Sequence, residues 1–356
     1  QVCSAKISCK IMNYNATYSG KITNISPITP DSKYFTIHLE NFPAEYQPGQ
    51  YVVISRLING REYRRSYSIV SFDPDRKELG FIIKRIDNGT VSRTLIDKAV
   101  TGDTLEVVAI NGFFTLPADI GNRYEQVFFI AAGSGIAPVL PMIQALTGTG
   151  LRINLLYSSK SPAATIFYNE LNALADNHDN FRIEYLFSTS GRAGMSRLNN
   201  TLLTRYIHRE AVTTFDKALF YTCGPLDYMD TVSITLLTEG VPREHIRKEL
   251  YYNYEIEELA VPEDTAVHNV TLHFPNGETH ELEVQYPDSI LNTALKKGLK
   301  LPYSCGSGQC GSCTARTVSG KVWMAYNEVL TDRELSQGYV LTCLGFPVEG
   351  DVVLEF

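Results

Sequence analysis

The chain has 356 residues, and a content of 44% hydrophobic and 20% charged residues is typical of a folded protein of this length with two or three domains. The formal net charge of −7 argues against a nucleic-acid-binding protein. No apolar run approaches the roughly 20 residues of a membrane-spanning helix, so no membrane partner is expected.

Residues 1–12 are expected to be an extension outside the fold. The stretch Gln1–Ile11 lacks the apolar core of a secretory signal peptide, and Met12 is a candidate natural start. Cys3 and Cys9 lie in this extension. Without a secretory signal we expect a cytoplasmic location, where free thiols persist.

Residues 13–118 are expected to be all-β and to form a small antiparallel barrel. Phe35, Ile37 and Leu39 alternate with polar residues, which is the period of a half-buried strand. Frequent turn-forming pairs divide the segment into short strands, as in a barrel. These pairs are Pro48-Gly49, Asn59-Gly60, Asn88-Gly89 and Asn111-Gly112.

Two short stretches of this segment carry groups that can bind a phosphate and a flat ring. Arg65 is a permanent cation, Tyr67 offers an aromatic face and Ser68 offers a hydroxyl. The small residues from Gly89 to Ser92 suit a phosphate-sized loop. Either stretch alone would be interpreted as an exposed basic strand or an ordinary turn.

Residues 119–250 alternate strands with helices, which indicates a parallel sheet. The continuous apolar run Val127–Ala131 is typical of a strand that is buried on both faces, and a helical pattern follows from Val139 to Leu146. Further strands are expected at 153–157, 183–187 and 218–223.

Small residues lie between this buried strand and its helix. Gly133, Ser134 and Gly135 would let a pyrophosphate approach the backbone and the helix N-terminus. Pro138 stands where a full dinucleotide fingerprint has its third glycine, and tight strand–helix packing would explain the two glycines about as often.

A second stretch of this segment, Cys223-Gly224-Pro225, ends a later strand. Open α/β sheets bind ligands outside such strand ends. Taken alone, however, Cys223 is more often a small buried hydrophobic residue than a working thiol.

Residues 251–266 hold five acids and no base and are expected to be a linker. From 267 to 356 the pattern is β-rich again, with a hairpin signal at Pro275-Asn276-Gly277 and a short helix capped by Asp288 or Ser289. This last segment has ten acids and six bases, so it concentrates negative charge. A solvated surface explains that charge at least as well as a docking face does.

Four cysteines of the last segment have the spacing of a plant-type [2Fe–2S] site. Cys305, Cys310 and Cys313 form C-x4-C-x2-C, and Cys343 supplies a fourth thiolate. The main use of such a cluster is the transfer of single electrons. A structural zinc site usually pairs C-x2-C with a second C-x2-C, and disulfides need an oxidising context, so both alternatives are disfavoured.

The first two segments resemble the ferredoxin–NADP reductase superfamily, and residues 267–356 resemble plant-type ferredoxins. The resemblance rests on five matches. They are Arg65-Ser66-Tyr67-Ser68 to the flavin motif R-x-Y-[ST], Gly89–Ser92 to the pyrophosphate motif G-x-x-S, Gly133–Pro138 to the nicotinamide motif G-x-G-[IV]-[AT]-P, Cys223–Pro225 to C-G-P, and Gly338–Cys343 to the segment with the fourth cluster ligand.

The resemblance implies a multidomain fold with a flavin-binding antiparallel β-barrel, a nicotinamide-binding α/β domain with a parallel sheet, and an α+β β-grasp ferredoxin domain. It implies catalytic positions at Tyr67, Ser68, Cys223 and Glu249. It implies cofactor-binding positions at Arg65, Tyr67, Ser68, Gly89, Val91, Ser92, Gly133, Ser134, Gly135, Pro138, Cys223, Gly224 and Pro225. The cluster ligands would be Cys305, Cys310, Cys313 and Cys343.

The family's roles carry over to these positions. Arg65 and Ser92 would hold flavin phosphates, and Tyr67 would pack against the isoalloxazine, with Ser68 near its N5. Cys223 would lie near the nicotinamide ring. Glu249 belongs to an E-x-[FY] ending that would lie beside the flavin.

The order of the parts resembles the reductase components of oxygenases, including that of phenylacetyl-CoA epoxidase. It implies an NAD(P)H-dependent oxidoreductase in which FAD takes a hydride and the [2Fe–2S] cluster passes single electrons to an oxygenase. FAD is favoured over FMN because G-x-x-S serves a pyrophosphate in this family. Alternative electron acceptors for such a reductase are a ring-hydroxylating dioxygenase, a desaturase or a hybrid-cluster protein.

A non-enzymatic redox sensor is a further alternative, against which the nicotinamide motifs argue. Whether NADH or NADPH is the donor stays open. Arg192 and Arg197 follow the strand that ends at Phe187 and could meet a 2′-phosphate, but arginines are common on protein surfaces.

Overall fold

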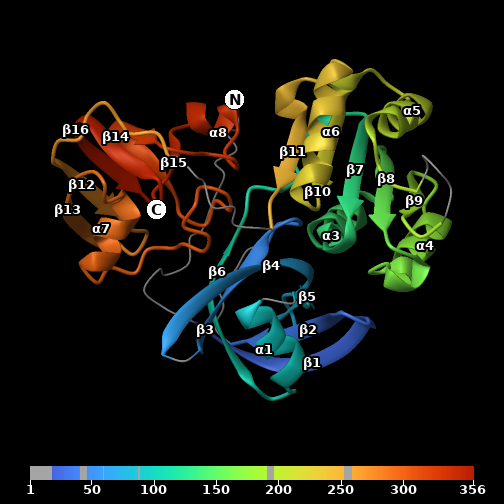
Figure 1. The fold of residues 1–356 in the computed structure, drawn as a ribbon, viewed down its shortest axis with the longest axis horizontal. Coiled ribbons are helices and arrows are strands. Elements are labelled where there is room, and N and C mark those ends of the chain that lie inside the picture. The colour runs from blue at the N-terminus through green and yellow to red at the C-terminus, as the bar shows by residue number, and fades with distance from the viewer. Residues whose placement is uncertain (1–17, 41–45, 59, 87–88, 191–195, 252–258) are drawn as a thin grey trace.

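The computed structural model describes residues 18–40, 46–58, 60–86, 89–190, 196–251 and 259–356. These residues form three lobes, each built on its own sheet (Figure 1). The expected N-terminal extension, most of the linker, Asn59, Asn88 and Arg192 lie outside the described residues. None of the described helices has the length and apolar character to cross a membrane.

The first lobe is the predicted antiparallel barrel, closed in the order β1-β2-β5-β4-β3-β6. Its strands are β1 (Tyr18–Thr29), β2 (Ser32–Leu39), β3 (Tyr51–Ile58), β4 (Arg61–Asp73), β5 (Glu78–Lys84) and β6 (Thr104–Asn111). Phe35, Ile37 and Leu39 of β2 are buried in the barrel core, as their alternation predicted.

A helix interrupts the barrel, which the expectation of an all-β segment missed. Helix α1 (Thr90–Lys98) begins directly after Gly89. Val91 and Leu95 lie four residues apart on one face of α1 and are buried in the barrel core. The loop expected from Gly89 to Ser92 is therefore the first turn of a helix that covers the barrel.

The second lobe is the predicted parallel sheet, in the order β11-β10-β7-β8-β9. Its strands are β7 (Gln126–Ala132), β8 (Arg152–Ser159), β9 (Phe181–Phe187), β10 (Ala218–Cys223) and β11 (Ile246–Glu249). Its helices are α2 (Ile120–Arg123), α3 (Ile136–Leu146), α4 (Tyr168–Asn177), α5 (Asn200–Glu210) and α6 (Leu226–Thr238).

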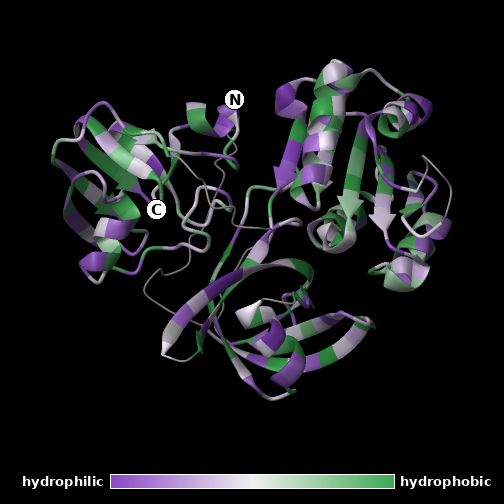
Figure 2. Ribbon diagram, viewed as in Figure 1, coloured by the Kyte–Doolittle hydropathy of each residue, from purple (hydrophilic) through white to green (hydrophobic). Residues whose placement is uncertain are grey.

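The central strand β7 supplies both cores of this lobe. Val127 and Phe129 pack with residues of α3, whereas Phe128 and Ile130 pack on the other face with residues of α5 and α6. Burial on both faces explains the continuous apolar run, which stands out in the hydropathy colouring (Figure 2). The strand order reverses between β7 and β10, where open α/β sheets bind their ligands.

The third lobe is a mixed sheet in the order β13-β12-β16-β14-β15, with β12 and β16 parallel. Its elements are β12 (His268–His273), β13 (Thr279–Val284), α7 (Ile290–Lys296), β14 (Thr314–Met324), α8 (Asp332–Ser336), β15 (Tyr339–Leu341) and β16 (Gly345–Glu355). Ser289, rather than Asp288, caps α7, because its side chain accepts a hydrogen bond from the Asn292 amide. Ile290, Leu291 and Ala294 of α7 pack into the core of the sheet.

Candidate active site

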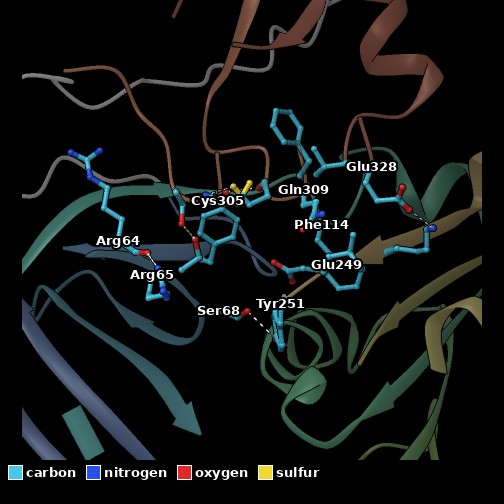
Figure 3. Close-up of a pocket in the computed structure, with 17 residues that line it drawn as sticks. Arg64, Arg65, Ser68, Phe114, Glu249, Tyr251, Cys305, Gln309 and Glu328 are labelled. Atoms are coloured by element: carbon cyan, nitrogen blue, oxygen red, sulfur yellow. Dashed lines mark hydrogen bonds and ion pairs between the residues drawn. The ribbon is translucent and has the colours of Figure 1, made fainter. Parts of the chain in front are cut away.

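A pocket lies where the three lobes meet. The barrel contributes Arg65 and Ser68, the end of the parallel sheet contributes Glu249, and the third lobe contributes Cys305 and Cys310. Figure 3 shows Ser68 and Tyr251 on one side of the pocket and Cys305 and Gln309 on the opposite side, with Glu249 between them. The fold thus brings predicted residues of the flavin motif, the cluster motif and the E-x-[FY] ending to a common space, whereas the residues of the nicotinamide motifs do not belong to its lining.

Strand β4 carries the predicted flavin motif along the pocket. Ser66 and Ser68 line the pocket, and Arg65 Nη1 donates a hydrogen bond to the carbonyl of Arg64 at 2.7 Å. The Tyr67 ring is not part of the lining. It stacks on Phe81 with centroids 5.6 Å apart, and burial raises the pKa of its hydroxyl.

The first turn of α1 contains a buried hydroxyl that fits a phosphate group. Ser92 is buried, and its Oγ has no hydrogen-bond partner among the described residues. A Cβ added at Gly89 would lie 2.3 Å from this Oγ, so the turn is closely packed around the hydroxyl. Free N–H groups at a helix start also favour anions, so the turn suits the pyrophosphate that the sequence motif predicts. Val91 points into the barrel core and holds the turn in place.

The predicted nicotinamide motifs lie at the carboxyl ends of β7 and β10, at the reversal of the strand order. Gly133–Gly135 forms a 3-10 turn between β7 and α3, and Gly133 has φ = +56°, a conformation that favours glycine. A Cβ at Gly135 would lie 2.1 Å from the Cys223 carbonyl oxygen, so the close approach of the two strand ends requires glycine there. Pro138 is buried in the first turn of α3.

The Cys223 thiol is fully buried at the end of β10, and burial is the main reason that its pKa lies well above the usual value. A thiol of this kind is a poor nucleophile. Gly224 is buried next to it, and Pro225 caps α6. The first two residues of the predicted motif are therefore neutral and buried at the carboxyl end of β10.

Glu249 and Tyr251 connect the two halves of the site. Glu249 is the last residue of β11, and burial raises the pKa of its carboxyl to about 8. Its Oε2 has no hydrogen-bond partner in the described part of the chain. The hydroxyl of Tyr251 lies 3.1 Å from Ser68 Oγ and donates to the carbonyl of Ser134 at 3.3 Å. In the sequence, Tyr251 stands out only as part of the ending E-x-[FY].

The four predicted cluster ligands lie in two pairs. Hydrogen bonds that involve the Cys310 thiol and Ser307 lower the pKa of the Cys305 thiol. Cys313 is within hydrogen-bond reach of Cys343. The intervening glycines 306, 308 and 311 have φ between +70° and +74°.

This donor set fits a two-iron cluster, in which each iron takes two thiolates. Backbone N–H groups already point at the sulfurs: Ser307 N lies 3.3 Å from Cys305 Sγ, and Ser312 N lies 3.5 Å from Cys310 Sγ. No three potential ligands gather around a single point within the described ranges.

Two ion pairs join the third lobe to β11. Lys248 Nζ lies 2.6 Å from Glu328 Oε1, and Arg247 Nη1 lies 3.7 Å from Glu334 Oε1. No sequence pattern identifies these residues, because ion pairs between distant segments leave no local signal.

Comparison with known proteins follows the same division into three parts. Residues 19–115 match the family "Oxidoreductase FAD-binding domain", residues 129–233 match "Oxidoreductase NAD-binding domain", and residues 273–348 match "2Fe-2S iron-sulfur cluster binding domain".

Two curated relatives match almost end to end. The ferredoxin reductase component of 3-ketosteroid-9-alpha-monooxygenase from Rhodococcus rhodochrous is 31% identical, over 87% of this chain and 88% of its own length. One of the subunits of 1,2-phenylacetyl-CoA epoxidase from Escherichia coli is also 31% identical, with the same coverage. The solved structure of phthalate dioxygenase reductase shares the fold, with a TM-score of 0.58 at 24% identity, over 96% of this chain and 98% of that one.

Proposed function

This chain belongs to the family of NAD(P)H-dependent reductases in which FAD-binding, NAD-binding and [2Fe–2S] domains together serve oxygenases, and we propose that electrons cross it at the pocket between the three lobes. One observation carries this proposal: Ser68, Glu249 and Cys305, from three lobes, line the same pocket. When bound, FAD supplies the exchange between the two-electron donor NAD(P)H and the one-electron [2Fe–2S] carrier.

We assign the binding of the flavin to the barrel. Arg65 and the free hydroxyl of Ser92 would hold its phosphates, because one is a permanent cation and the other has no protein partner among the described residues. Ser68 offers a hydroxyl to the ring, and the Tyr251 side chain would cover it. In this assignment Tyr67 must leave its stack on Phe81, or else support the ring from within the barrel.

We assign the binding of the nicotinamide nucleotide to the carboxyl ends of the neighbouring strands β7 and β10. Gly133 leaves the backbone open to a pyrophosphate, and the α3 N-terminus favours its charge. The neutral thiol of Cys223 gives the ring an apolar neighbour. Glu249, with a pKa of about 8, is mainly protonated at neutral pH and can donate a hydrogen bond into the pocket.

The proposed acceptor is an oxygenase, because the curated relatives named above are reductase components or subunits of a monooxygenase and an epoxidase. Their oxygenases differ, so the substrate of the acceptor is not part of the proposal. We also propose a cytoplasmic location, because four free cluster thiols require a reducing compartment.

The test is cofactor analysis and turnover of the anaerobically purified chain. We expect FAD, two irons per chain, and reduction of cytochrome c by NADH or NADPH. Zinc in place of iron, or a colourless protein that does not accept electrons from either nucleotide, would rule the proposal out.

A further inference from the structure

One barrel tyrosine reaches out of its lobe into the cluster loop, residues 303–313. Tyr51 begins β3 and is only 4% exposed. Its hydroxyl donates to the carbonyl of Cys310 at 2.6 Å and lies 2.7 Å from Ser312 Oγ. These two contacts span 259 and 261 residues of sequence.

The same tyrosine belongs to the wall of the candidate flavin site. In the barrel sheet, Tyr51 stands opposite Ser68 of the flavin motif on one side and opposite Asn111 of β6 on the other. Asn111 Nδ2 also donates to the carbonyl of Ser312, at 3.3 Å. Ser68, Tyr51 and Asn111 therefore lie side by side on three adjacent strands. Ser68 is the candidate flavin contact, and the other two residues contact Ser312.

Ser312 contacts both Tyr51 and the predicted cluster ligand Cys310. Its side chain is fully buried, and its Oγ lies 3.3 Å from Cys310 Sγ. Once Cys310 is a metal-bound thiolate, it can only accept, so the Ser312 hydroxyl becomes the donor to sulfur. The Tyr51 hydroxyl has one proton, and this proton is then shared between the Cys310 carbonyl and Ser312 Oγ, which keeps both residues against the barrel.

We propose that Tyr51 is a positioning residue for electron transfer between flavin and cluster. Its hydroxyl holds the Cys310–Ser312 segment against the barrel and, through Ser312, keeps a hydrogen bond on the Cys310 sulfur. The inference rests on the proposed function. It adds a specific role for the hydroxyl, because the neighbouring contacts Ser66–Ser304 and Arg64–Tyr303 involve the first two residues of the cluster loop rather than Cys310 or Ser312.

Two consequences follow from this arrangement. Hydrogen bonds to cluster sulfurs raise the reduction potential, so loss of the Tyr51 hydroxyl should make the potential more negative. A loosened loop should also slow the step between flavin and cluster, since small misplacements of reacting groups lower rates strongly. Reduction of the flavin by NAD(P)H should not change.

The experiment compares Tyr51→Phe with Tyr34→Phe in the full chain loaded with FAD and cluster. Tyr34 is the matched control, because its hydroxyl contacts Ser71 within the barrel at 2.6 Å. Electron paramagnetic resonance during a redox titration gives the cluster potential. Ferricyanide reports electrons taken directly from the flavin, and cytochrome c reports electrons that pass through the cluster.

For Tyr51→Phe we expect a more negative cluster potential, altered cluster g-values, and a roughly tenfold lower ratio of cytochrome c to ferricyanide turnover, on the order expected for one lost hydrogen bond. Tyr34→Phe should match the wild type in all three. An unchanged potential and ratio in Tyr51→Phe would overturn the inference while leaving the proposed function intact. If the wild type itself did not reduce ferricyanide with NAD(P)H, the proposed function would fail instead.

A second variant covers failure of Tyr51→Phe to fold or to hold its cluster. Ser312→Ala removes the link between the tyrosine and the sulfur from the other side, and it should shift the potential in the same direction. A double variant should add little to either single change, because both act on one hydrogen-bond network. A wild-type potential in Ser312→Ala, or full additivity in the double variant, would also overturn the inference.

Discussion

The hydroxyl of Tyr251 lies 3.1 Å from that of Ser68, so the end of the nicotinamide lobe touches the flavin motif directly. The same hydroxyl donates to Ser134 in the predicted pyrophosphate loop. In the proposed assignment, the ring of Tyr251 would lie between the nicotinamide and a flavin beside Ser68, and nucleotide binding would have to displace this side chain.

Shortening Tyr251 should tighten nucleotide binding. In Tyr251→Ser the nucleotide no longer has to break the two hydroxyl contacts and move the ring, so we expect KM for the preferred nucleotide to fall by about tenfold, on the order of one or two hydrogen bonds. Steady-state ferricyanide reduction measures KM. Tyr185→Ser, which alters an aromatic cluster elsewhere in the lobe, should not lower KM. An equal or higher KM in Tyr251→Ser would show that the ring does not obstruct the nucleotide.

Removing the Ser92 hydroxyl should weaken FAD binding without destabilising the fold. This buried hydroxyl has no partner among the described residues, so Ser92→Ala loses no protein hydrogen bond. A hydrogen bond to a charged phosphate contributes about 1.5–3 kcal/mol, so the dissociation constant of FAD should rise at least tenfold. The recovery of flavin fluorescence on dilution of the loaded protein measures this dissociation constant.

Thr94→Ala provides the control in the same helix, since its hydroxyl bonds only to the Thr90 carbonyl among the contacts described. It should leave the FAD affinity unchanged. Equal FAD affinities of Ser92→Ala and the wild type would remove Ser92 from the candidate site.

Glu249 should make the protein less stable as the pH rises. Its carboxyl has a pKa of about 8 in the fold, against 4.5 as the ordinary value, so the folded state retains a proton that the unfolded state loses between these values. The free energy of unfolding therefore falls from about pH 4.5 to pH 8. Thermal unfolding of the wild type and Glu249→Gln at pH 5.5 and pH 8.5 measures the effect.

Glu249→Gln cannot titrate, so it should lose less stability over this range than the wild type. We expect a difference on the order of 2 kcal/mol, less than the full pKa shift implies because the side chain is only partly shielded from water. Parallel stability curves for the two proteins would contradict the raised pKa.

The ion pair between Lys248 and Glu328 should support docking of the third lobe. The side chains are 28% and 25% exposed, so the pair is expected to contribute less than about 1 kcal/mol. Glu328→Gln should slow the stopped-flow reduction of the cluster by about two- to fivefold at low salt. Salt screens the pair, so the wild-type rate should approach that of the variant as ionic strength rises.

A charge elsewhere in the protein serves as the control. Glu125 pairs with Lys217 within the second lobe, at 3.7 Å, and Glu125→Gln should leave the cluster reduction rate and its salt dependence unchanged. A rate for Glu328→Gln that equals that of the wild type at all salt concentrations would contradict a role of the pair in docking.

Features encoded over short stretches could be predicted from the sequence. The alternation around Ile37 placed one face of β2 in the barrel core, and the apolar run at Val127 identified the central strand of the parallel sheet. The motifs around Gly133 and Cys305 likewise depend on residues a few positions apart. Local spacing determines these features because it sets backbone conformation and the order of ligands along a loop.

Helix α1 and strand β11 were not predicted. The segment of α1 is short and follows a turn signal, so its two buried positions did not stand out from the surrounding β pattern. Strand β11 is four residues long, polar and at the sheet edge, and therefore lacks the apolar run of the inner strands. In both, tertiary packing outweighs weak local propensity.

Short runs of residues encode the groups that are predicted to carry the chemistry: the cluster cysteines, the Gly89–Ser92 and Gly133–Pro138 motifs, and the basic–aromatic flavin motif. Which of these groups face one another depends on the packing of the three lobes. Tyr51 and Ser312 are 261 positions apart and lie in contact because the closed barrel packs against the third lobe. Such contacts have no periodicity along the chain, since the solvation and shape of whole surfaces set them rather than the preferences of neighbouring residues.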